Sequence, residues 1–343
     1  MTVLQSGAPV ADATVVTDPV VRFVDTERRF GEVTALASLR LDIPSGAITV
    51  ILGPNGAGKT TAMRLITGAL SPSSGAVEVF GLRPDGPDGG TIRRRCGVVT
   101  AKPSLYDRLN GWDNLRYAAE LFGFDRSPDT DARIADAAAR FGIVDALEQQ
   151  VGGYSTGMKT RLALARSVLH DPELLLLDEP TSGLDPESAA AVLDLIRHMT
   201  SAGQTVVLCT HLLAEAEGLA DQMVVMEGGA LMTAGTPGAL AARHWPLPLV
   251  YLGSDRPDDL DRLALWAEVE GYERDGARAA VTLASPEVDL ALLVARLCAE
   301  GVRLTSVEPY RPSLEDIYFA ERAADRPVPP PPDGRALAPV GAS

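Results

Sequence analysis

The feature that most constrains the fold of this chain is the glycine-rich octapeptide from Gly53 to Thr60, which follows an apolar run over residues 47–52. Its letters match G-x-x-x-x-G-K-[ST], and a helix-compatible stretch over residues 61–70 comes directly after it. A strand, a glycine turn and a helix suit phosphate binding, because backbone N–H groups and the helix N-terminus supply positive charge. The pattern predicts a nucleoside triphosphate site in an α/β protein.

Two side chains of this loop have predicted roles of their own. Lys59 would reach the β- and γ-phosphates, and the Thr60 hydroxyl would bind Mg²⁺. An empty glycine turn is the plainer alternative, but the strand before the loop and the helix after it favour ligand binding. ATP with Mg²⁺ is the expected ligand, and the predicted nucleotide-binding residues here are Gly53, Pro54, Asn55, Gly56, Ala57, Gly58, Lys59, Thr60 and Thr61.

A second candidate element is Leu174–Glu179, in which four leucines precede two carboxylates. A buried parallel strand here would bring Asp178 and Glu179 to the sheet edge at which the glycine loop opens. Asp178 would hold magnesium, directly or through water, and Glu179 would accept a proton from, or orient, the water that attacks the γ-phosphate. Without the glycine loop, an Asp-Glu pair at the start of a surface helix would be the default interpretation.

The order of the other elements predicts a mostly parallel sheet with ligand-binding loops at the strand C-termini. Between about residues 90 and 160 the apolar periodicity is helical, which predicts a helical subdomain inserted into the core. Further strands are expected at 20–23, 39–43 and 205–209, and helices at 112–122, 130–141, 162–169 and 186–200.

A compositional break at His244–Pro248 predicts a second, smaller domain. The main domain is expected over residues 20–244 and a small α+β domain over 245–322. Residues 1–19 and the proline-rich residues 323–343 are expected to be disordered. The smaller domain is expected to contain strand 249–252, helix 258–269, strand 279–283, helix 286–300, strand 302–307 and a helix from Leu314, with Ser313 and Asp316 as its capping box.

Between the two phosphate motifs stands Tyr154-Ser155-Thr156-Gly157-Met158, which resembles Leu-Ser-Gly-Gly-Gln, the signature of the ATP-binding cassette (ABC) family. With this segment, residues 20–240 resemble the nucleotide-binding subunit of an ABC transporter, with its P-loop NTPase core. In that family the signature caps a helix and binds the γ-phosphate held by the opposite subunit. Ser155 offers a hydroxyl and a helix N-cap, and Gly157 allows close backbone approach.

The resemblance implies three further site residues. Asp185 ends a segment from Ser182 that is similar to the D-loop, which crosses the dimer interface in the family. His211 stands where the family has its switch histidine, so Glu179 and His211 are the expected catalytic residues. Phe30 stands where an adenine-stacking aromatic usually lies, although an aromatic residue at a strand end is more often part of the core.

Two sites depart from the family pattern. Aligning Val99–Pro103 on the loop that leads into the helical insertion puts Ala101 where the family has a glutamine. A methyl group contacts neither magnesium nor the attacking water, and the neighbouring Lys102 brings a positive charge instead of a neutral amide. Thr156 and Met158 replace the first glycine and the glutamine of the signature. We therefore predict slower hydrolysis than in a relative with Gln and Gly at these sites.

The stretches 104–109, 112–115 and 312–316 resemble the subgroup that serves exporters with separate membrane subunits, such as drug-resistance, polysaccharide and sodium-efflux systems. This implies a self-dimer or cassette heterodimer on the cytoplasmic face of the membrane, which powers export through a polytopic permease subunit docked around residues 101–123. Two alternatives stay open: a soluble cassette ATPase that remodels a cytosolic complex, and a weakly hydrolysing regulatory subunit.

The composition excludes some other classes. A net charge of −15, from 31 basic and 46 acidic residues, argues against a nucleic-acid partner. No apolar stretch reaches the ~20 residues of a membrane span, and no signal peptide is expected, so a membrane part would come from another chain. The three cysteines, Cys96, Cys209 and Cys298, are far apart and outside any CxxC pattern, which disfavours a disulfide framework or a zinc site.

Overall fold

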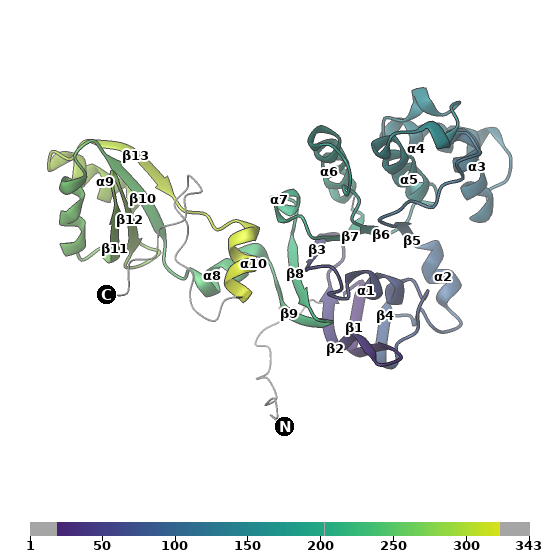
Figure 1. Ribbon diagram of the computed structural model, residues 1–343, viewed down its shortest axis with the longest axis horizontal. Coiled ribbons are helices and arrows are strands. Elements are labelled where there is room, and N and C mark those ends of the chain that lie inside the picture. The colour runs from purple at the N-terminus through teal and green to yellow at the C-terminus, as the bar shows by residue number, and fades with distance from the viewer. Residues whose placement is uncertain (1–18, 202, 323–343) are drawn as a thin grey trace. The chain divides into compact units, whose positions relative to one another are not determined.

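The computed structural model of the 343-residue chain describes residues 19–201 and 203–322, as a ribbon in Figure 1. The contacts between residues divide the chain into two units, with the boundary between Pro237 and Gly238. The ends that the sequence predicts to be disordered, residues 1–19 and 323–343, lie outside the described residues apart from Pro19.

A six-stranded sheet in the order β5-β6-β7-β3-β8-β9 forms the framework of the first unit. The first five strands are parallel, and β9 pairs antiparallel with β8, which confirms the predicted α/β class with a mostly parallel sheet. Every residue of β3, β6 and β7 is buried, as continuous apolar strands in the middle of such a sheet require. The strands are β3 (Ile48–Leu52), β5 (Cys96–Val99), β6 (Leu174–Asp178), β7 (Thr205–Thr210), β8 (Gln222–Glu227) and β9 (Ala230–Gly235).

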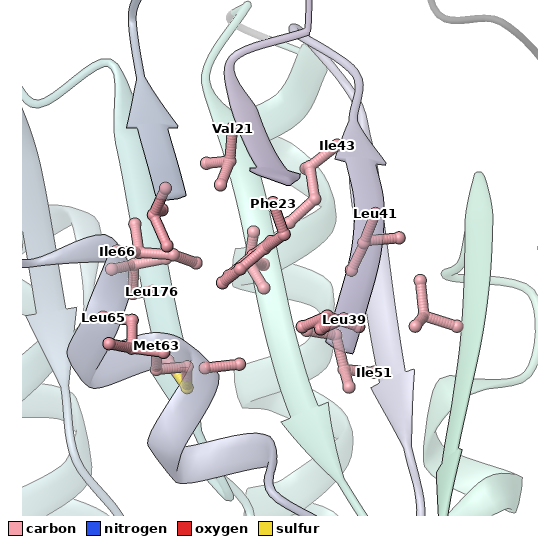
Figure 2. Close-up of a cluster of buried hydrophobic side chains, with 14 of the residues drawn as sticks. Val21, Phe23, Leu39, Leu41, Ile43, Ile51, Met63, Leu65, Ile66 and Leu176 are labelled. Atoms are coloured by element: carbon pink, nitrogen blue, oxygen red, sulfur yellow. The ribbon is translucent and has the colours of Figure 1, made fainter. Parts of the chain in front are cut away.

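A second, antiparallel sheet of the first unit has the order β2-β1-β4. Its strands are β1 (Val21–Phe30), β2 (Val33–Ile43) and β4 (Ser74–Val79). β1 and β2 extend beyond the predicted strands 20–23 and 39–43, and they pair with each other antiparallel along the added length. Figure 2 shows how Phe23 and Leu39 of this sheet pack in one cluster with Leu65 of helix α1 (Lys59–Ile66) and Ile51 of β3. The cluster holds α1 against β3, the strand that leads into the glycine loop.

Helices make up most of the chain between β5 and β6. α3, α4 and α5 contact one another, and polar caps start them: Asn110 accepts a hydrogen bond from Asp113 N, and Ser127 one from Thr130 N. The predicted helical range from about residue 90 also contains β5, which pairs with β6 in the main sheet. The remaining helices of this unit are α2 (Gly89–Arg94), α3 (Gly111–Leu121), α4 (Pro128–Arg140), η1 (Val144–Ala146), η2 (Val151–Gly153), α5 (Thr156–Val168), α6 (Pro186–Ser201) and α7 (Leu213–Ala216).

The second unit contains an antiparallel sheet in the order β11-β12-β10-β13. Leu260 and Leu263 of η3, with Leu293 and Leu297 of α9, pack on one face of it in a single hydrophobic cluster. Strands and helices follow one another as in a split β-α-β fold. The elements are α8 (Pro237–His244), β10 (Leu249–Ser254), η3 (Pro257–Leu265), β11 (Val269–Asp275), β12 (Arg278–Leu283), α9 (Leu290–Ala299), β13 (Leu304–Pro309) and α10 (Leu314–Arg322).

Two details of this unit bear on the sequence predictions. The helix expected over residues 258–269 is a 3-10 helix that ends at Leu265, and it is followed by β11, which the sequence did not predict. The capping box of α10 is confirmed. Ser313 Oγ accepts a hydrogen bond from Asp316 N at 3.1 Å, and Asp316 Oδ2 accepts one from Ser313 N at 2.8 Å.

No helix within residues 19–201 and 203–322 combines the length and the apolar character that crossing a bilayer requires.

Candidate functional site

Two glycines of the loop between β3 and α1 are required by the packing of the chain itself. A Cβ atom on Gly53 would lie 2.3 Å from the carbonyl oxygen of Met226 in β8. A Cβ atom on Gly58 would lie 2.8 Å from the carbonyl oxygen of Ala35 in β2, and Gly58 also has a φ of 102°. The loop therefore packs closely against β8 and β2, and this packing restricts its backbone conformation even without a ligand.

Lys59 is held inside this loop. Its side chain is nearly buried, and the ammonium donates hydrogen bonds to the carbonyl oxygens of Gly53 at 2.6 Å and Pro54 at 3.3 Å. The same Nζ atom lies 3.8 Å from Oε1 of Glu179. These partners compensate the buried charge, as a buried ammonium requires. The lysine is thus positioned at the loop with a carboxylate beside it.

The hydroxyl of Thr60 donates a hydrogen bond of 2.9 Å to Oδ2 of Asp178, the last residue of β6. Burial is the main cause that raises the pKa of Asp178, and the neighbouring Glu179 carboxylate raises it further. A divalent cation would offset this cost. The hydroxyl and the carboxylate are hard oxygen donors of the kind that Mg²⁺ takes, so these two residues fit the predicted metal.

The protein offers few other ligands. Among the described residues, no group of three or more His, Cys, Asp or Glu side chains could hold a metal ion by itself. Mg²⁺ usually keeps several waters and is bound by one or two protein groups plus substrate phosphates. A site made of Thr60 and Asp178 is therefore suited to a metal that arrives with a nucleotide.

Glu179 lies between two nitrogen-bearing side chains. Its Oε2 is 2.8 Å from Nδ1 of His211, which follows β7, while Oε1 faces Lys59. The carboxylate is only 13% exposed, whereas the imidazole is 43% exposed. Glu179 has a φ of 51°, a left-handed conformation that costs a non-glycine residue about 1 kcal/mol. The backbone is therefore strained at the residue for which the sequence predicts a catalytic role.

The signature segment begins α5. Ser155 Oγ accepts a hydrogen bond of 3.2 Å from Met158 N, so the predicted N-cap is present. A Cβ atom on Gly157 would come no nearer to Ser188 than 3.5 Å, an ordinary contact. The packing of this subunit alone therefore does not demand glycine at 157, in contrast to Gly53 and Gly58. The atoms nearest to such a Cβ belong to Ser188 of α6 and to Leu184, which lies just before that helix.

The predicted D-loop residue caps the next helix. Asp185 Oδ1 accepts a hydrogen bond of 2.9 Å from Ser188 N. This backbone donor is the main cause that lowers the pKa of the Asp185 carboxyl. Thr156 of the signature also comes near, since its Cγ2 is 3.9 Å from where a Cβ on Gly183 would lie. The structure thus places the signature and the D-loop side by side in one subunit.

Phe30 ends β1 and is 44% exposed, with the Arg28 guanidinium 4.5 Å from the ring centroid. The alternative interpretation of this residue as part of the core is therefore wrong. Its ring lies at the surface, where it is accessible to a planar ligand.

One relationship near the site was not anticipated from the sequence. A cavity of about 240 Å³ is lined by Val99–Pro103, by Glu179, and by Thr156 and Lys159 of α5. Ala101 and Thr156, two of the departures from the family pattern, therefore line the same cavity as Glu179. The sequence shows that Ala101 and Thr156 differ from the family pattern, but nothing in their spacing indicates that they line one cavity.

The comparisons with known proteins agree with this geometry. The profile of the family described as ABC transporter matches residues 36–182. The daunorubicin resistance ATP-binding protein DrrA3 of Streptomyces coeruleorubidus is 35% identical over 91% of this chain and 98% of its own length. The Nod factor export ATP-binding protein I of Rhizobium sp. (strain N33) is 32% identical over 85% of this chain and 93% of its own length.

A solved structure of the same kind shares the fold. The structure of cbiO1 from Clostridium perfringens, described as part of the ABC transporter complex cbiONQ, is 27% identical and has a TM-score of 0.60. The match covers 66% of this chain and 92% of cbiO1. The matches thus extend over at least 92% of the length of each of these three proteins. This chain belongs to the ABC transporter family, as an ATP-binding protein with ATP hydrolase activity.

Proposed function

We propose that this chain is the ATP-hydrolysing subunit that powers export through a separate membrane permease. The observation that carries the proposal is the convergence of Lys59, Thr60, Asp178, Glu179 and His211 at one edge of the parallel sheet. The names of the two relatives, one for drug resistance and one for Nod factor export, support the direction of transport.

In this mechanism the triphosphate lies on the glycine loop, and Lys59 exchanges its carbonyl partners for phosphate oxygens. Thr60 and Asp178 would hold Mg²⁺, which when bound neutralises charge on the β- and γ-phosphates. Glu179 orients the attacking water and accepts its proton. His211 donates through Nδ1 to the Glu179 carboxylate and fixes its orientation.

A second copy, or a related cassette, completes the site in this proposal. Ser155 and Gly157 would bind the γ-phosphate held by the opposite subunit, and Asp185 would lie at the interface. The cap that Ser155 Oγ makes with Met158 N supports this, because it presents the signature at the start of α5, and a helix N-terminus attracts phosphate. Phe30 would stack on the adenine. Closing and opening of the dimer would move the permease helices.

The permease is proposed to dock on the helical insertion around residues 101–123, which places this chain on the cytoplasmic face of the membrane. Tyr106, Tyr117 and Leu121 are 50%, 41% and 71% exposed there. Clustered exposed apolar side chains are typical of a protein interface. The second unit, residues 245–322 in the sequence-based division, is proposed to buttress or regulate the dimer.

The test is a pull-down from native membranes with tagged Glu179→Gln protein and excess ATP, analysed by mass spectrometry. We expect an ATP-bound dimer that brings down one polytopic membrane protein in near-equal amount. The matched control is Glu287→Gln, an exposed glutamate of the second unit, which should not trap the dimer. If the Glu179→Gln protein stayed monomeric in excess ATP, the proposal that ATP drives dimerisation would be wrong. Recovery of soluble partners alone would favour a cytosolic ATPase.

A weakly hydrolysing regulatory subunit is the second candidate. It is favoured by one observation, the presence of Ala101 and Thr156 in the cavity that Glu179 lines. The turnover rate of the purified chain with saturating ATP and Mg²⁺ separates the two candidates, because a motor must hydrolyse ATP when its dimer forms.

A further inference from the structure

The end of β1 is tied to the segment before β4 by hydrogen bonds on both sides of Arg28. Arg29 N donates to Ser73 Oγ at 3.0 Å, and Ser73 N donates to the carbonyl oxygen of Glu27 at 2.7 Å. These bonds fix the backbone that carries Arg28. The exposed ring of Phe30 follows two residues later, at the end of the strand.

The side chain of Arg28 joins this ring to the same segment. Its guanidinium carbon lies over the ring of Phe30, 4.5 Å from the centroid, and its Nη1 donates a hydrogen bond of 2.9 Å to the carbonyl oxygen of Ser71. A cation at this distance from the centre of an aromatic ring is attracted to the π-electrons. Arg28 therefore restrains Phe30 from one side of the ring.

The charge of Arg28 is not shared with an anion. No carboxylate in the described part of the chain pairs with Arg28, and its Nε is buried without a hydrogen-bond partner there. The ring of Phe30 is the electron-rich group that remains beside this guanidinium. The other arginines of β1 and β2 form ion pairs instead: Arg22 with Asp42, Arg29 with Glu27 and Arg40 with Asp25.

We infer that Arg28 is a positioning residue for the adenine of ATP, and that it acts by holding the ring of Phe30 where the base can stack on it. The inference rests on the proposed function, in which Phe30 stacks on the adenine. Phe30 is 44% exposed although Arg28 covers one side, so ring surface remains for a planar ligand. A ring that is already restrained loses little conformational freedom when the base binds, which increases the affinity.

This role concerns the base alone. The triphosphate binds at the glycine loop in the proposed mechanism, and the groups that act on the γ-phosphate are Lys59, Glu179 and His211. Arg28 should therefore affect the binding of nucleotides, but neither the binding of phosphate chains that lack a base nor the rate of the chemical step.

The experiment compares ligand binding by full-length variants in calorimetric titrations. Arg28→Gln removes the charge but keeps a donor for the carbonyl of Ser71, whereas Arg28→Lys keeps the charge. We expect Arg28→Gln to weaken ATP binding about threefold, and Arg28→Lys to bind ATP nearly as the parent chain does. Binding of inorganic tripolyphosphate and kcat at saturating ATP should stay unchanged in both variants. The matched control is Arg22→Gln at the other end of β1.

The results that would overturn the inference differ from the expected ones in kind. Unchanged ATP binding in Arg28→Gln would do so. Equal losses for ATP and tripolyphosphate would also overturn it, because the effect would then concern the phosphates or the folding of the chain. The same holds for a loss in Arg28→Lys as large as that in Arg28→Gln, since the charge would then be irrelevant.

A double-mutant cycle shows whether Arg28 acts through the ring. In a Phe30→Leu chain, Arg28→Gln should cause no further loss of ATP affinity, and an additional threefold loss there would contradict the inference. If Phe30→Leu alone bound ATP as tightly as the parent chain, the adenine stacking in the proposed function would be wrong. Weak ATP binding by Phe30→Leu with normal binding by Arg28→Gln would refute only the role of Arg28, so the two failures are distinguishable.

Discussion

Glu179 and His211 follow neighbouring parallel strands and are joined by a hydrogen bond of 2.8 Å between Oε2 and Nδ1. Both residues lie just past the carboxyl ends of β6 and β7, where parallel strands expose their following loops to a ligand. The strained φ of Glu179 turns the chain sharply after β6. The carboxylate is thereby held between a lysine and an imidazole.

Removing this imidazole should slow hydrolysis without releasing ATP. We expect His211→Ala to lower kcat by about 10²-fold, because Glu179 loses the group that orients it during proton transfer. Affinity for ATP should change little, since Lys59 and the glycine loop are untouched. The measurements are steady-state phosphate release and titration with a fluorescent ATP analogue. His198→Ala, which alters an exposed histidine of α6, is the control, and an unchanged kcat in His211→Ala would show that Glu179 acts without His211.

Removing the Thr60 hydroxyl should weaken nucleotide binding only when magnesium is present. Thr60→Val removes an oxygen ligand and leaves the buried Asp178 carboxylate without its donor. We expect about tenfold weaker ATP binding with Mg²⁺, and near-normal binding in EDTA. Calorimetric titration in the two buffers measures both values. Thr200→Val, whose hydroxyl bonds the Arg197 carbonyl on α6, is the matched control, and equal losses with and without Mg²⁺ would contradict the metal role.

The capping box of α10 should contribute measurably to stability. Ser313→Ala removes the acceptor of the Asp316 N–H and should cost about 1 kcal/mol of unfolding free energy. Thr305→Ser, at an exposed position of β13, is the comparison variant. Urea unfolding followed by tryptophan fluorescence gives both values, and a loss no larger than that of the comparison variant would mean that the reciprocal hydrogen bonds are not maintained in solution.

The stability of the chain should also fall in mild acid because of His170. Its pKa is lowered in the folded state by burial, so the unfolded chain binds more protons below the ordinary histidine pKa of about 6.5. The contribution of neutral His170 is therefore fully present above that pH and is lost as the pH falls. We expect His170→Gln to lose less unfolding free energy between pH 7.5 and pH 5.5 than the parent chain. Parallel urea titrations at the two pH values measure the difference, and equal losses would contradict it.

Local sequence was enough to predict the elements with a strong signal of their own. The leucine run of β6 and the glycine loop after β3 could be recognised because apolar strands and phosphate loops have short, characteristic patterns. The predicted helical range wrongly includes β5, because its four residues, Cys96–Val99, take their strand conformation from pairing with β6. β11 was missed since its residues are mostly exposed and polar, and the hairpin with β12 decides its structure.

The residues of the candidate site likewise fall into those that a local motif predicts and those whose position depends on tertiary packing. Lys59, Thr60, Asp178 and Glu179 belong to motifs whose letters define them, and the sheet topology brings these motifs to one edge. The position of Ala101 and Thr156 in the cavity beside Glu179 depends on how α5 packs against the loop after β5. That packing brings together segments about 55 residues apart in the sequence, and a local sequence pattern cannot predict such a contact.

This cavity makes the predicted slow hydrolysis testable. Ala101→Gln introduces a neutral amide into the space that Glu179 lines, where it could hold the attacking water. Thr156→Gly removes a methyl group that lies near Gly183, and it opens the signature to closer phosphate approach. We expect the double variant to raise kcat by about three- to tenfold, an effect of roughly 1 kcal/mol on the barrier. Ala135→Gln on the exposed face of α4 is the matched control.

The two single variants show which departure limits the rate. Because Ala101 lines the cavity beside Glu179 in its own subunit, Ala101→Gln should act on the chemical step and leave dimer formation unchanged. Thr156→Gly should instead strengthen ATP-dependent dimerisation, since the signature contacts the nucleotide of the opposite subunit in the proposed mechanism. Steady-state turnover and light scattering with ATP separate these effects. No gain in kcat for the double variant would show that neither departure slows the reaction, and that another step, such as release of products, sets the rate.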